Sequence, residues 1–201
     1  ATVWALVERN GVWRLEELTF NSGDRHAIDS WVFKDIGTTG IITGLDHLND
    51  QLVSIVIQAI DPASGDSSHF IVADRTVESG SITLAESAAF GQKAYVGLKY
   101  TNSFQLLSRD GVSQMGTSQS TTRRWHKMFL RLDDSAIPLV EGQPAKDRSP
   151  ATPMGLGERF ISGDTEVVNL GTGEGDLIIS QNKPLISEVV AVFGKLTAKE
   201  I

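Results

Sequence analysis

The pattern of hydrophobic and polar positions predicts short β-strands along most of the chain. The clearest signal lies at the start, where the strand-like runs Val3–Arg9 and Val12–Leu18 flank the dipeptide Asn10-Gly11. An Asn-Gly pair readily adopts the positive φ angles that a type I′ turn requires. We therefore expect an N-terminal β-hairpin with a two-residue turn.

Further runs of β-branched and aromatic residues continue this pattern, and turn-forming residues separate them. Gly37–Gly44 is predicted to be a connector and Asp61–Asp66 a turn. In the run Arg123–Leu132, an imperfect alternation puts Met128 and Leu130 on the same side of a strand. The predicted strands are Ser30–Lys34, Leu52–Ile57, Ser68–Ala73, Ser81–Leu84, Ala94–Tyr100, Arg123–Leu132, Glu166–Leu170, Leu177–Ser180 and Ile186–Phe193.

Several segments have the composition of turns and loops rather than strands. Arg109–Thr122 lacks an apolar period and is predicted to be a long exposed loop. Glu141–Gly157 contains Pro144, Pro150 and Pro153, so we expect a loop that resists both helix and strand pairing. Two turns complete these predictions, a hairpin turn at Gly171–Asp176 and a turn at Asp133-Asp134 after the Arg123–Leu132 strand.

The spacing of these segments predicts the fold class and the division of the chain. We expect an all-β protein whose short antiparallel strands form sandwich or small-barrel units. The predicted parts are an N-terminal β-hairpin segment at 1–43, a β-domain at 44–108, and a C-terminal β-domain at 109–201 with long loops at 109–122 and 141–157. The first part is a candidate remnant of a β-propeller. In that case the two β-domains would adjoin a propeller blade.

Length and composition support a folded chain and narrow its chemistry. With 201 residues and 40% apolar content, the chain can bury one large core or two small ones. The absence of cysteine excludes disulfides and cysteine-based metal sites. The longest apolar runs, such as Val189–Phe193, are far shorter than the roughly 20 residues of a membrane span. We therefore expect no membrane span. The chain begins with Ala1, which suggests a processed product or a segment of a longer chain.

The charge balance argues against a protein that grips nucleic acid. The net charge is −7 at pH 7, the pI is near 5.1, and the sequence has no tract rich in lysine or arginine. Proteins that bind phosphates tightly usually present a basic patch or stripe. Tight nucleic-acid binding is therefore disfavoured.

The histidines do not form a recognisable metal or catalytic motif. None of His26, His47, His69 and His126 has the paired spacing that places two imidazoles on one face of a strand or helix. Asp46 could orient His47, but no Gly-x-Ser-x-Gly nucleophile elbow is present. Hydrogen bonds within a local turn are the simpler role for Asp46-His47.

Other candidate motifs are equally incomplete. Asp61, Ser64 and Asp66 do not match the spacing of an EF-hand calcium loop, and Gly171–Asp176 lacks the Lys-Ser/Thr of a phosphate loop. Two carboxylates could still face each other across a cleft, as in glycoside hydrolases. The tryptophans could stack on sugars or bases, but large aromatic residues more often fill a core or a subunit contact. These tryptophans are Trp4, Trp13, Trp31 and Trp125. We predict no catalytic, cofactor-binding or metal-binding residue.

Several phrases of the sequence resemble one protein family. Gly44–Val53 is similar to a segment of the tail tubular protein B or tail nozzle proteins of short-tailed phages, in which a Gly-Leu-x-His-Leu phrase precedes a β-branched strand. Further phrases occur in the same order as in the family. Val3–Arg9 precedes this segment, and Gly80–Leu84 and Ala94–Thr101 follow it. The last phrases, Phe160–Val167, Leu177–Gln181 and Pro184-Leu185, resemble the family's closing hairpin. Departures are Asp50 where glycine is expected, the long turn Asp61–Asp66 and a weak match over Arg109–Gly157.

The resemblance implies a structural virion protein of a bacteriophage tail, without catalytic residues or cofactors. Such proteins form an oligomeric ring, often sixfold, in the tail tube or nozzle through which DNA is ejected. The implied partners are other tail subunits in a homo-oligomeric ring and the portal, adaptor or tail fibre proteins, while DNA passes without specific binding. The chain would be the C-terminal part of such a protein or a shortened relative, located in the virion tail and assembled in the host cytoplasm. Loops 109–122 and 142–157 are candidates for subunit contacts.

The main alternative is a tail-associated module that binds carbohydrate or degrades the cell envelope. Acidic and tryptophan side chains would supply its site. The sequence leaves the two interpretations open.

Overall fold

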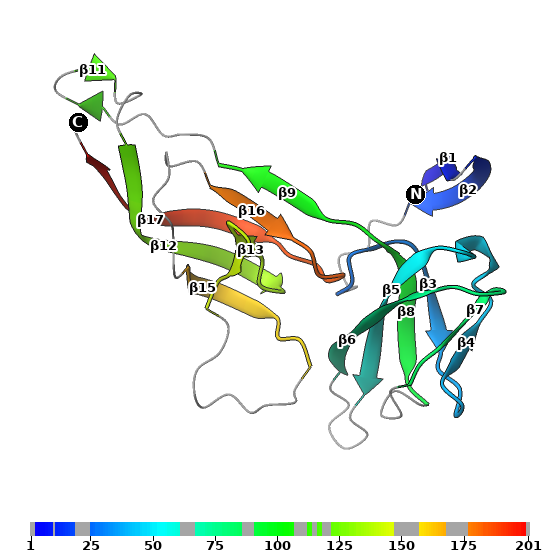
Figure 1. Ribbon diagram of the computed structural model, residues 1–201. Coiled ribbons are helices and arrows are strands. Elements are labelled where there is room, and N and C mark those ends of the chain that lie inside the picture. Colours follow the sequence, from blue (N-terminus) through cyan, green and yellow to red (C-terminus); the bar gives the residue numbers. More distant parts are fainter. Residues whose placement is uncertain are drawn as a thin grey trace.

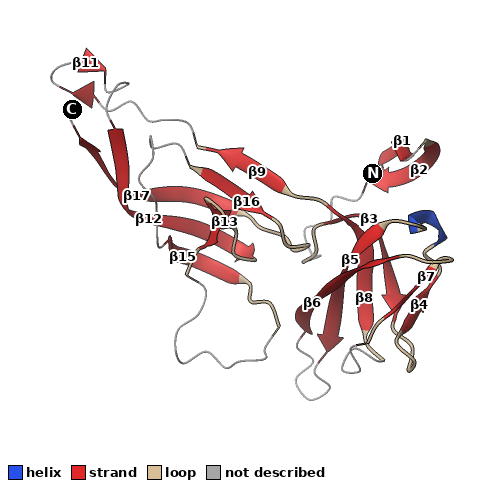
Figure 2. Ribbon diagram, viewed as in Figure 1, coloured by secondary structure: helices blue, strands red, loops and turns tan. Residues whose placement is uncertain are grey.

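The computed structural model describes residues 3–9, 11–18, 25–60, 67–85, 91–106, 112–113, 116–117, 122–146, 157–167 and 177–199. Within these ranges the chain forms antiparallel strands and one short 3₁₀ helix, and it contains no α-helix (Figures 1 and 2). The molecule is elongated, with an N-terminal lobe built from β3 to β8, a C-terminal lobe built from β9 to β17, and a hairpin of β1 and β2 beside the N-terminal lobe (Figure 1). The all-β prediction is confirmed.

The N-terminal hairpin pairs β1 (Val3–Arg9) with β2 (Val12–Leu18). Arg9 pairs with Val12, so two residues remain for the turn. Gly11 has a φ of 77°, the left-handed conformation that this turn demands of its second residue. Asn10 itself lies outside the described residues. The predicted hairpin is confirmed by its register.

The N-terminal lobe contains a four-stranded sheet in the order β3-β8-β5-β6 and a small sheet of β4 and β7. The two sheets enclose a core that includes Leu45, Leu48 and Ile55. The elements of this lobe are β3 (Ile28–Asp35), β4 (Ile41–Thr43), the 3₁₀ helix η1 (Asp46–Leu48), β5 (Leu52–Ile60), β6 (Ser67–Thr76), β7 (Ser81–Thr83) and β8 (Lys93–Lys99).

Strand β5 is buried on both of its faces, which explains its nearly continuous apolar sequence. Val53, Ile55 and Ile57 point into the core of the N-terminal lobe. Val56 points the opposite way, into a separate cluster with Tyr95 and residues of the C-terminal lobe. A strand covered on one face only would show alternation between polar and apolar positions.

The C-terminal lobe is a sandwich of two open sheets, in the orders β15-β12-β17 and β14-β13-β16-β9. Met128, Leu130 and Leu132 of β12 lie in the core between the sheets, on the strand side that the alternation predicted. The elements are β9 (Asn102–Gln105), β12 (Thr122–Ser135), β13 (Leu139–Val140), β14 (Gln143–Pro144), β15 (Ile161–Val167), β16 (Ile178–Gln181) and β17 (Val189–Lys199). Of the two predicted forms, sandwich and small barrel, the sandwich describes these sheets.

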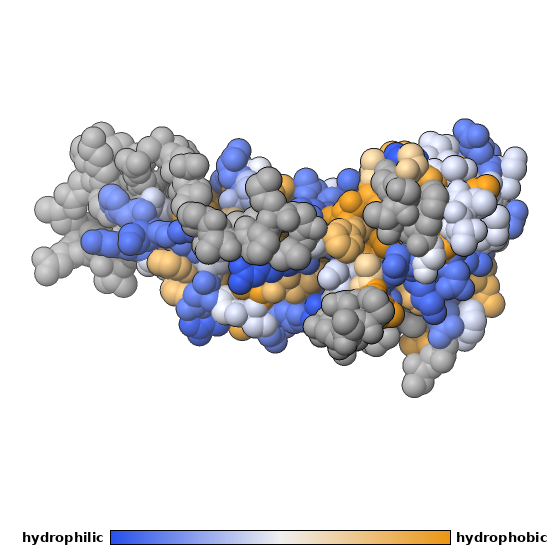
Figure 3. Space-filling model, turned by 90° about the horizontal axis from the view of Figure 1, so that it is seen from below, coloured by the Kyte–Doolittle hydropathy of each residue, from blue (hydrophilic) through white to orange (hydrophobic). Residues whose placement is uncertain are grey.

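A third apolar cluster joins the two lobes. Ile28, Val56 and Tyr95 of the N-terminal lobe pack against Ala136 and Leu185 of the C-terminal lobe. An ion pair of 3.0 Å between Arg25 and Asp134 and a backbone hydrogen bond from Ala27 to Pro184 lie at the same junction. On the face drawn in Figure 3, hydrophobic residues gather most densely near this junction.

The sheets extend across the boundaries that the sequence suggested for the parts of the chain. Strand β3 (Ile28–Asp35) pairs with β8, so one sheet spans residue 43. Strand β9 (Asn102–Gln105) pairs with β16 and thus lies in the C-terminal lobe. Among the helices of the described chain, none is sufficiently long and apolar to span a membrane.

The predicted hairpin around Gly171–Asp176 is wrong. Strand β15 pairs with β12, whereas β16 pairs with β13 and β9 in the other sheet of the sandwich. The described strands before and after these residues therefore belong to different sheets. Local composition predicts that the chain turns, but it does not identify the pairing partner. The turn residues themselves lie outside the described ranges.

The predicted turn at Asp133-Asp134 is also wrong, because both residues lie within β12. The register shifts between Leu132 and Ser135, and Asp134 has a φ of 36°. The pair therefore forms a β-bulge, an irregularity that tolerates the same residue types as a turn.

The predicted loops contain short strands where the structure describes them. Pro144 belongs to β14, which pairs with β13 at the edge of its sheet. An edge position leaves one side of the strand unpaired, so a proline without an N–H is tolerated there. Within 109–122, β10 (Val112–Ser113) pairs with β11 (Gly116–Thr117). Most of both predicted loops lies outside the described residues.

Candidate functional site

The strongest local irregularity near a pocket is a β-bulge in β3. Asp29 pairs with Leu98 and Val32 with Val96, so Ser30 and Trp31 together face Gly97 of β8. A side chain on Gly97 would meet the Asp29 carbonyl oxygen at 2.6 Å and the Trp31 Cα at 2.8 Å. The absence of a side chain at Gly97 therefore permits the bulge.

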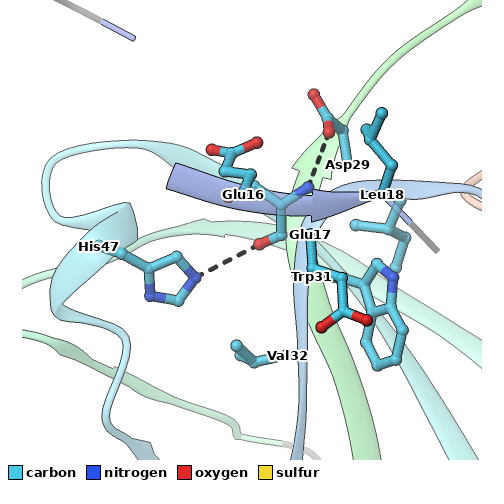
Figure 4. Close-up of a pocket in the computed structure, with 9 residues that line it drawn as sticks. Glu16, Glu17, Leu18, Asp29, Trp31, Val32 and His47 are labelled. Atoms are coloured by element: carbon cyan, nitrogen blue, oxygen red, sulfur yellow. Dashed lines mark hydrogen bonds between the residues drawn. The ribbon is translucent and has the colours of Figure 1, made fainter. Parts of the chain in front are cut away.

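Hydrogen bonds from two directions hold the bulge in place (Figure 4). Ser30 has a φ of 51°, which is unfavourable for a residue other than glycine. Its N–H donates to the Asp29 carboxylate at 2.8 Å, and its carbonyl oxygen lies 3.3 Å from Nε2 of His47. With Nε2 protonated, His47 donates this second bond. Bulges of this kind often re-aim side chains beside functional sites.

An ion-pair cluster connects the hairpin to the bulge. Arg9 of β1 donates two hydrogen bonds to the Glu16 carboxylate, at 2.8 and 2.9 Å, and forms an ion pair of 2.8 Å with Asp29. The hydrogen bond to Glu16 raises the pKa of Arg9, and the same bond lowers the pKa of the Glu16 carboxyl group. Arg9 and Glu16 are therefore charged at neutral pH. The ion pair of Arg9 with Asp29 holds the inner face of the hairpin against β3.

These elements surround a pocket of about 570 Å³ (Figure 4). Strand β2 contributes Glu17 and Leu18, β3 contributes Asp29 and Trp31, and η1 contributes His47. The volume is within the range of small-molecule sites, but the lining is rich in carboxylates, whereas most such sites are mainly apolar. The combination of an aromatic ring with acidic hydrogen-bond acceptors would suit a hydroxyl-rich ligand.

Trp31 also belongs to a cluster of aromatic rings at the lobe junction. Its ring centroid lies 4.6 Å from that of His26 and 5.6 Å from that of Tyr95, both in edge-to-face geometry. Trp125 packs against the core of the C-terminal lobe. Trp4 and Trp13, in contrast, are 56% and 61% exposed on the outer side of the hairpin. The predicted core role is confirmed for Trp31 and Trp125, and the predicted core or contact role of Trp4 and Trp13 stays a prediction.

The histidines considered as a metal or catalytic motif belong to no metal-binding group within the part of the chain that the structure describes. Groups of His, Asp and Glu able to hold a metal ion are absent from the described residues. His47 contacts Ser30 rather than Asp46, whose carboxylate lies close to Gly80. The calcium motif at Asp61–Asp66 lies outside the described ranges. Sequence reasoning missed the pocket because its walls come from three separated segments, and the positive φ of Ser30 leaves no signal in the residue type.

Two of the phrases that resemble the family, Gly44–Val53 and Gly80–Leu84, are joined by hydrogen bonds. The N–H of Leu45 donates to the Gly80 carbonyl at 2.9 Å, and the N–H of Gly80 donates to the Asn49 side chain at 3.1 Å. Leu45 and Leu48 are fully buried beneath this connection. Asp50, where the family pattern has glycine, has a φ of 62°, a conformation that glycine adopts most easily.

No protein-family model matches the chain, and no curated protein matches it.

Proposed function

We propose that this chain is a structural, non-enzymatic virion protein of a bacteriophage tail. In this role it is a subunit of a ring in the tail tube or nozzle through which DNA is ejected. Its partners are neighbouring tail subunits, and DNA passes it without specific binding.

The observation that carries the proposal is the link between the phrases Gly44–Val53 and Gly80–Leu84. These phrases resemble tail nozzle proteins in sequence, and here they meet through backbone and side-chain hydrogen bonds around η1. Their residues fill a core and satisfy turns, as expected of a structural scaffold. Buried Leu45 and Leu48 have no role in chemistry, so a scaffold explains why the phrase takes this form.

Immunogold electron microscopy tests the proposal directly. Antibodies raised against the purified chain are applied to virus particles from cultures that express it, and a preparation without primary antibody is the control. We expect label at the tail end of intact particles. Particles that lack the protein, with the chain present only in the cell fraction, would overturn the proposal.

The pocket beside the bulge favours one alternative, a tail-associated module that binds carbohydrate or degrades the cell envelope. Trp31, Glu17 and Asp29 provide an aromatic surface and acidic acceptors for sugar hydroxyl groups. A glycan array and a peptidoglycan-release assay distinguish this function. Sugar binding or lysis that is lost in Glu17→Gln, and kept in Glu8→Gln, would establish the alternative.

A further inference from the structure

The N-terminal hairpin carries large apolar side chains that are exposed on its outer side. Cross-strand pairing places Leu6 opposite Leu15, with Trp4 and Trp13 on the same side of the ribbon. These four residues, called here the outer hairpin face, are 56 to 67% exposed. Charged Arg9 lies on the half-buried inner side. Contiguous exposed apolar residues of this kind mark an interaction site.

Two carboxylates flank the outer hairpin face. Glu17 pairs with Trp4, and Glu8 pairs with Trp13, so acidic residues lie at opposite ends of the apolar stripe, and Glu17 lies where the stripe meets the rim of the pocket. Both glutamates are exposed. A complementary partner therefore has an apolar or aromatic centre and basic residues beside it.

The other end of the molecule carries a surface with these properties. On the side of β12 and β17 that faces away from the core, Phe129 and Phe193 stack with ring centroids 5.6 Å apart. Lys127 and Lys195 pair across the strands next to them, and Arg131 lies over the Phe193 ring. These five residues are called here the outer C-terminal face.

The lysine pair places two like charges opposite each other on this face. Like charges directly opposite one another destabilise a sheet. Arg131 is neutralised by Asp164, with hydrogen bonds of 2.7 and 3.0 Å. Neither Lys127 nor Lys195 has an ion pair with a described residue. A carboxylate supplied by another molecule would relieve the repulsion between them.

We propose that the outer hairpin face of one copy docks on the outer C-terminal face of the next copy. The two faces lie at opposite ends of the elongated molecule, so one copy cannot join them within itself (Figure 1). Such a head-to-tail contact is heterologous and generates a closed ring when its rotation closes. The inference rests on the proposed function, because it specifies the contact between subunits of that ring.

Charge-swap variants test the contact by sedimentation velocity. The first variant, Glu8→Lys with Glu17→Lys, makes the hairpin basic, and the second, Lys127→Glu with Lys195→Glu, makes the C-terminal face acidic. All four side chains are exposed, so both variants should fold. We expect the wild type to associate with a dissociation constant between about 10 μM and 1 mM, and each variant alone to bind at least about tenfold more weakly.

Mixing the two variants restores complementary charges at every contact. We expect association to return to the wild-type strength in the mixture, and to weaken at high salt because the rim charges are exposed. A wild-type chain that remains monomeric at about 1 mM, or variants without mutual rescue, would overturn the proposal. Oligonucleotide binding through the lysine pair without self-association would also overturn it.

The outcome is separable from that of the proposed function. Gold label on tails together with a monomeric chain would retain the virion role and reject this contact. Unlabelled particles together with charge-swap rescue would reject the virion role and retain self-association.

Discussion

At the scale of single residues, the β3 bulge depends on the missing side chain of Gly97. A Cβ there would approach backbone atoms of Asp29 and Trp31, which cannot rotate away as a side-chain end could. We expect Gly97→Ala to lower the free energy of unfolding by about 1–3 kcal/mol, as overpacking does elsewhere. Urea unfolding measures the change. Gly37→Ala is the control, because its Cβ would meet no neighbour closer than 3.8 Å. An equal loss of unfolding free energy in both variants would show that the close approach of a Cβ at residue 97 to the β3 backbone is not the cause.

His69 makes stability depend on pH because it is buried at the lobe junction. Burial lowers the pKa of His69 from its ordinary value of 6.5, and the positive charge of Arg25 lowers it further. The unfolded chain therefore binds a proton more readily than the folded one, so stability is full above pH 6.5 and falls as the pH decreases toward the folded pKa.

We expect His69→Gln to reduce the stability lost on acidification. The measurement is urea unfolding of wild type and variant at about pH 7.5 and 5.5. His126→Gln, on an exposed position of β12, is the matched control and should retain the wild-type dependence. If His69→Gln loses as much unfolding free energy between the two pH values as the wild type does, other titratable groups cause the pH dependence.

At the scale of elements, the sequence predicts where strands lie better than which strands pair. β-Branched runs place β5, β6 and β8 to within a few residues, and Asn10-Gly11 predicts the first hairpin with its register. The partners of β15 and β16 could not be predicted, because packing between sheets decides them. The bulge at Asp133-Asp134 was missed for a related reason, since its residue types fit a turn equally well.

The hairpin is an element whose position depends on a small number of charges. Arg9 links it to β3 through Asp29. We expect Arg9→Met to change the global free energy of unfolding by less than about 1 kcal/mol, because partly exposed ion pairs contribute little. Amide exchange in β1 and β2 should nevertheless become faster, as the hairpin separates from the body more often. Mass spectrometry after deuterium labelling measures this exchange.

The control for this variant is Arg131→Met, which removes a similar bidentate pair with Asp164 from the other lobe. In Arg131→Met, amide exchange in the hairpin should be the same as in the wild type. Unchanged exchange in Arg9→Met would mean that other contacts hold the hairpin.

At the scale of the whole molecule, the charge predicts how the chain behaves toward DNA. A net charge of −7 repels the phosphate backbone, and each phosphate contact would add salt-sensitive affinity. We expect no binding of duplex DNA in a gel-shift titration at about 0.1 M salt. Micromolar affinity that weakens with salt would contradict this expectation and direct attention to the basic residues of β12, which include Lys127.

The pocket could not be foreseen at this scale, because it arises from the meeting of the hairpin, β3 and η1. The sequence identified Trp31 and His47 as chemically notable, but placed them in different parts of the chain. Their proximity follows from the pairing of β3 with β8 and from the Arg9 ion pairs. Neither feature has a local sequence signal beyond Gly97.

The burial of β5 on both faces has a consequence for how the protein opens. Its neighbours β6 and β8 cover its edges, one lobe core covers Val53 and Ile55, and the lobe junction covers Val56. Separating the lobes would uncover only one face and would break none of its ladder bonds. We therefore expect the amide protons of β5 to exchange only through global unfolding, so their exchange free energy should equal that measured with denaturant. A lower value in native-state exchange measured by NMR would reveal an opening confined to the N-terminal lobe.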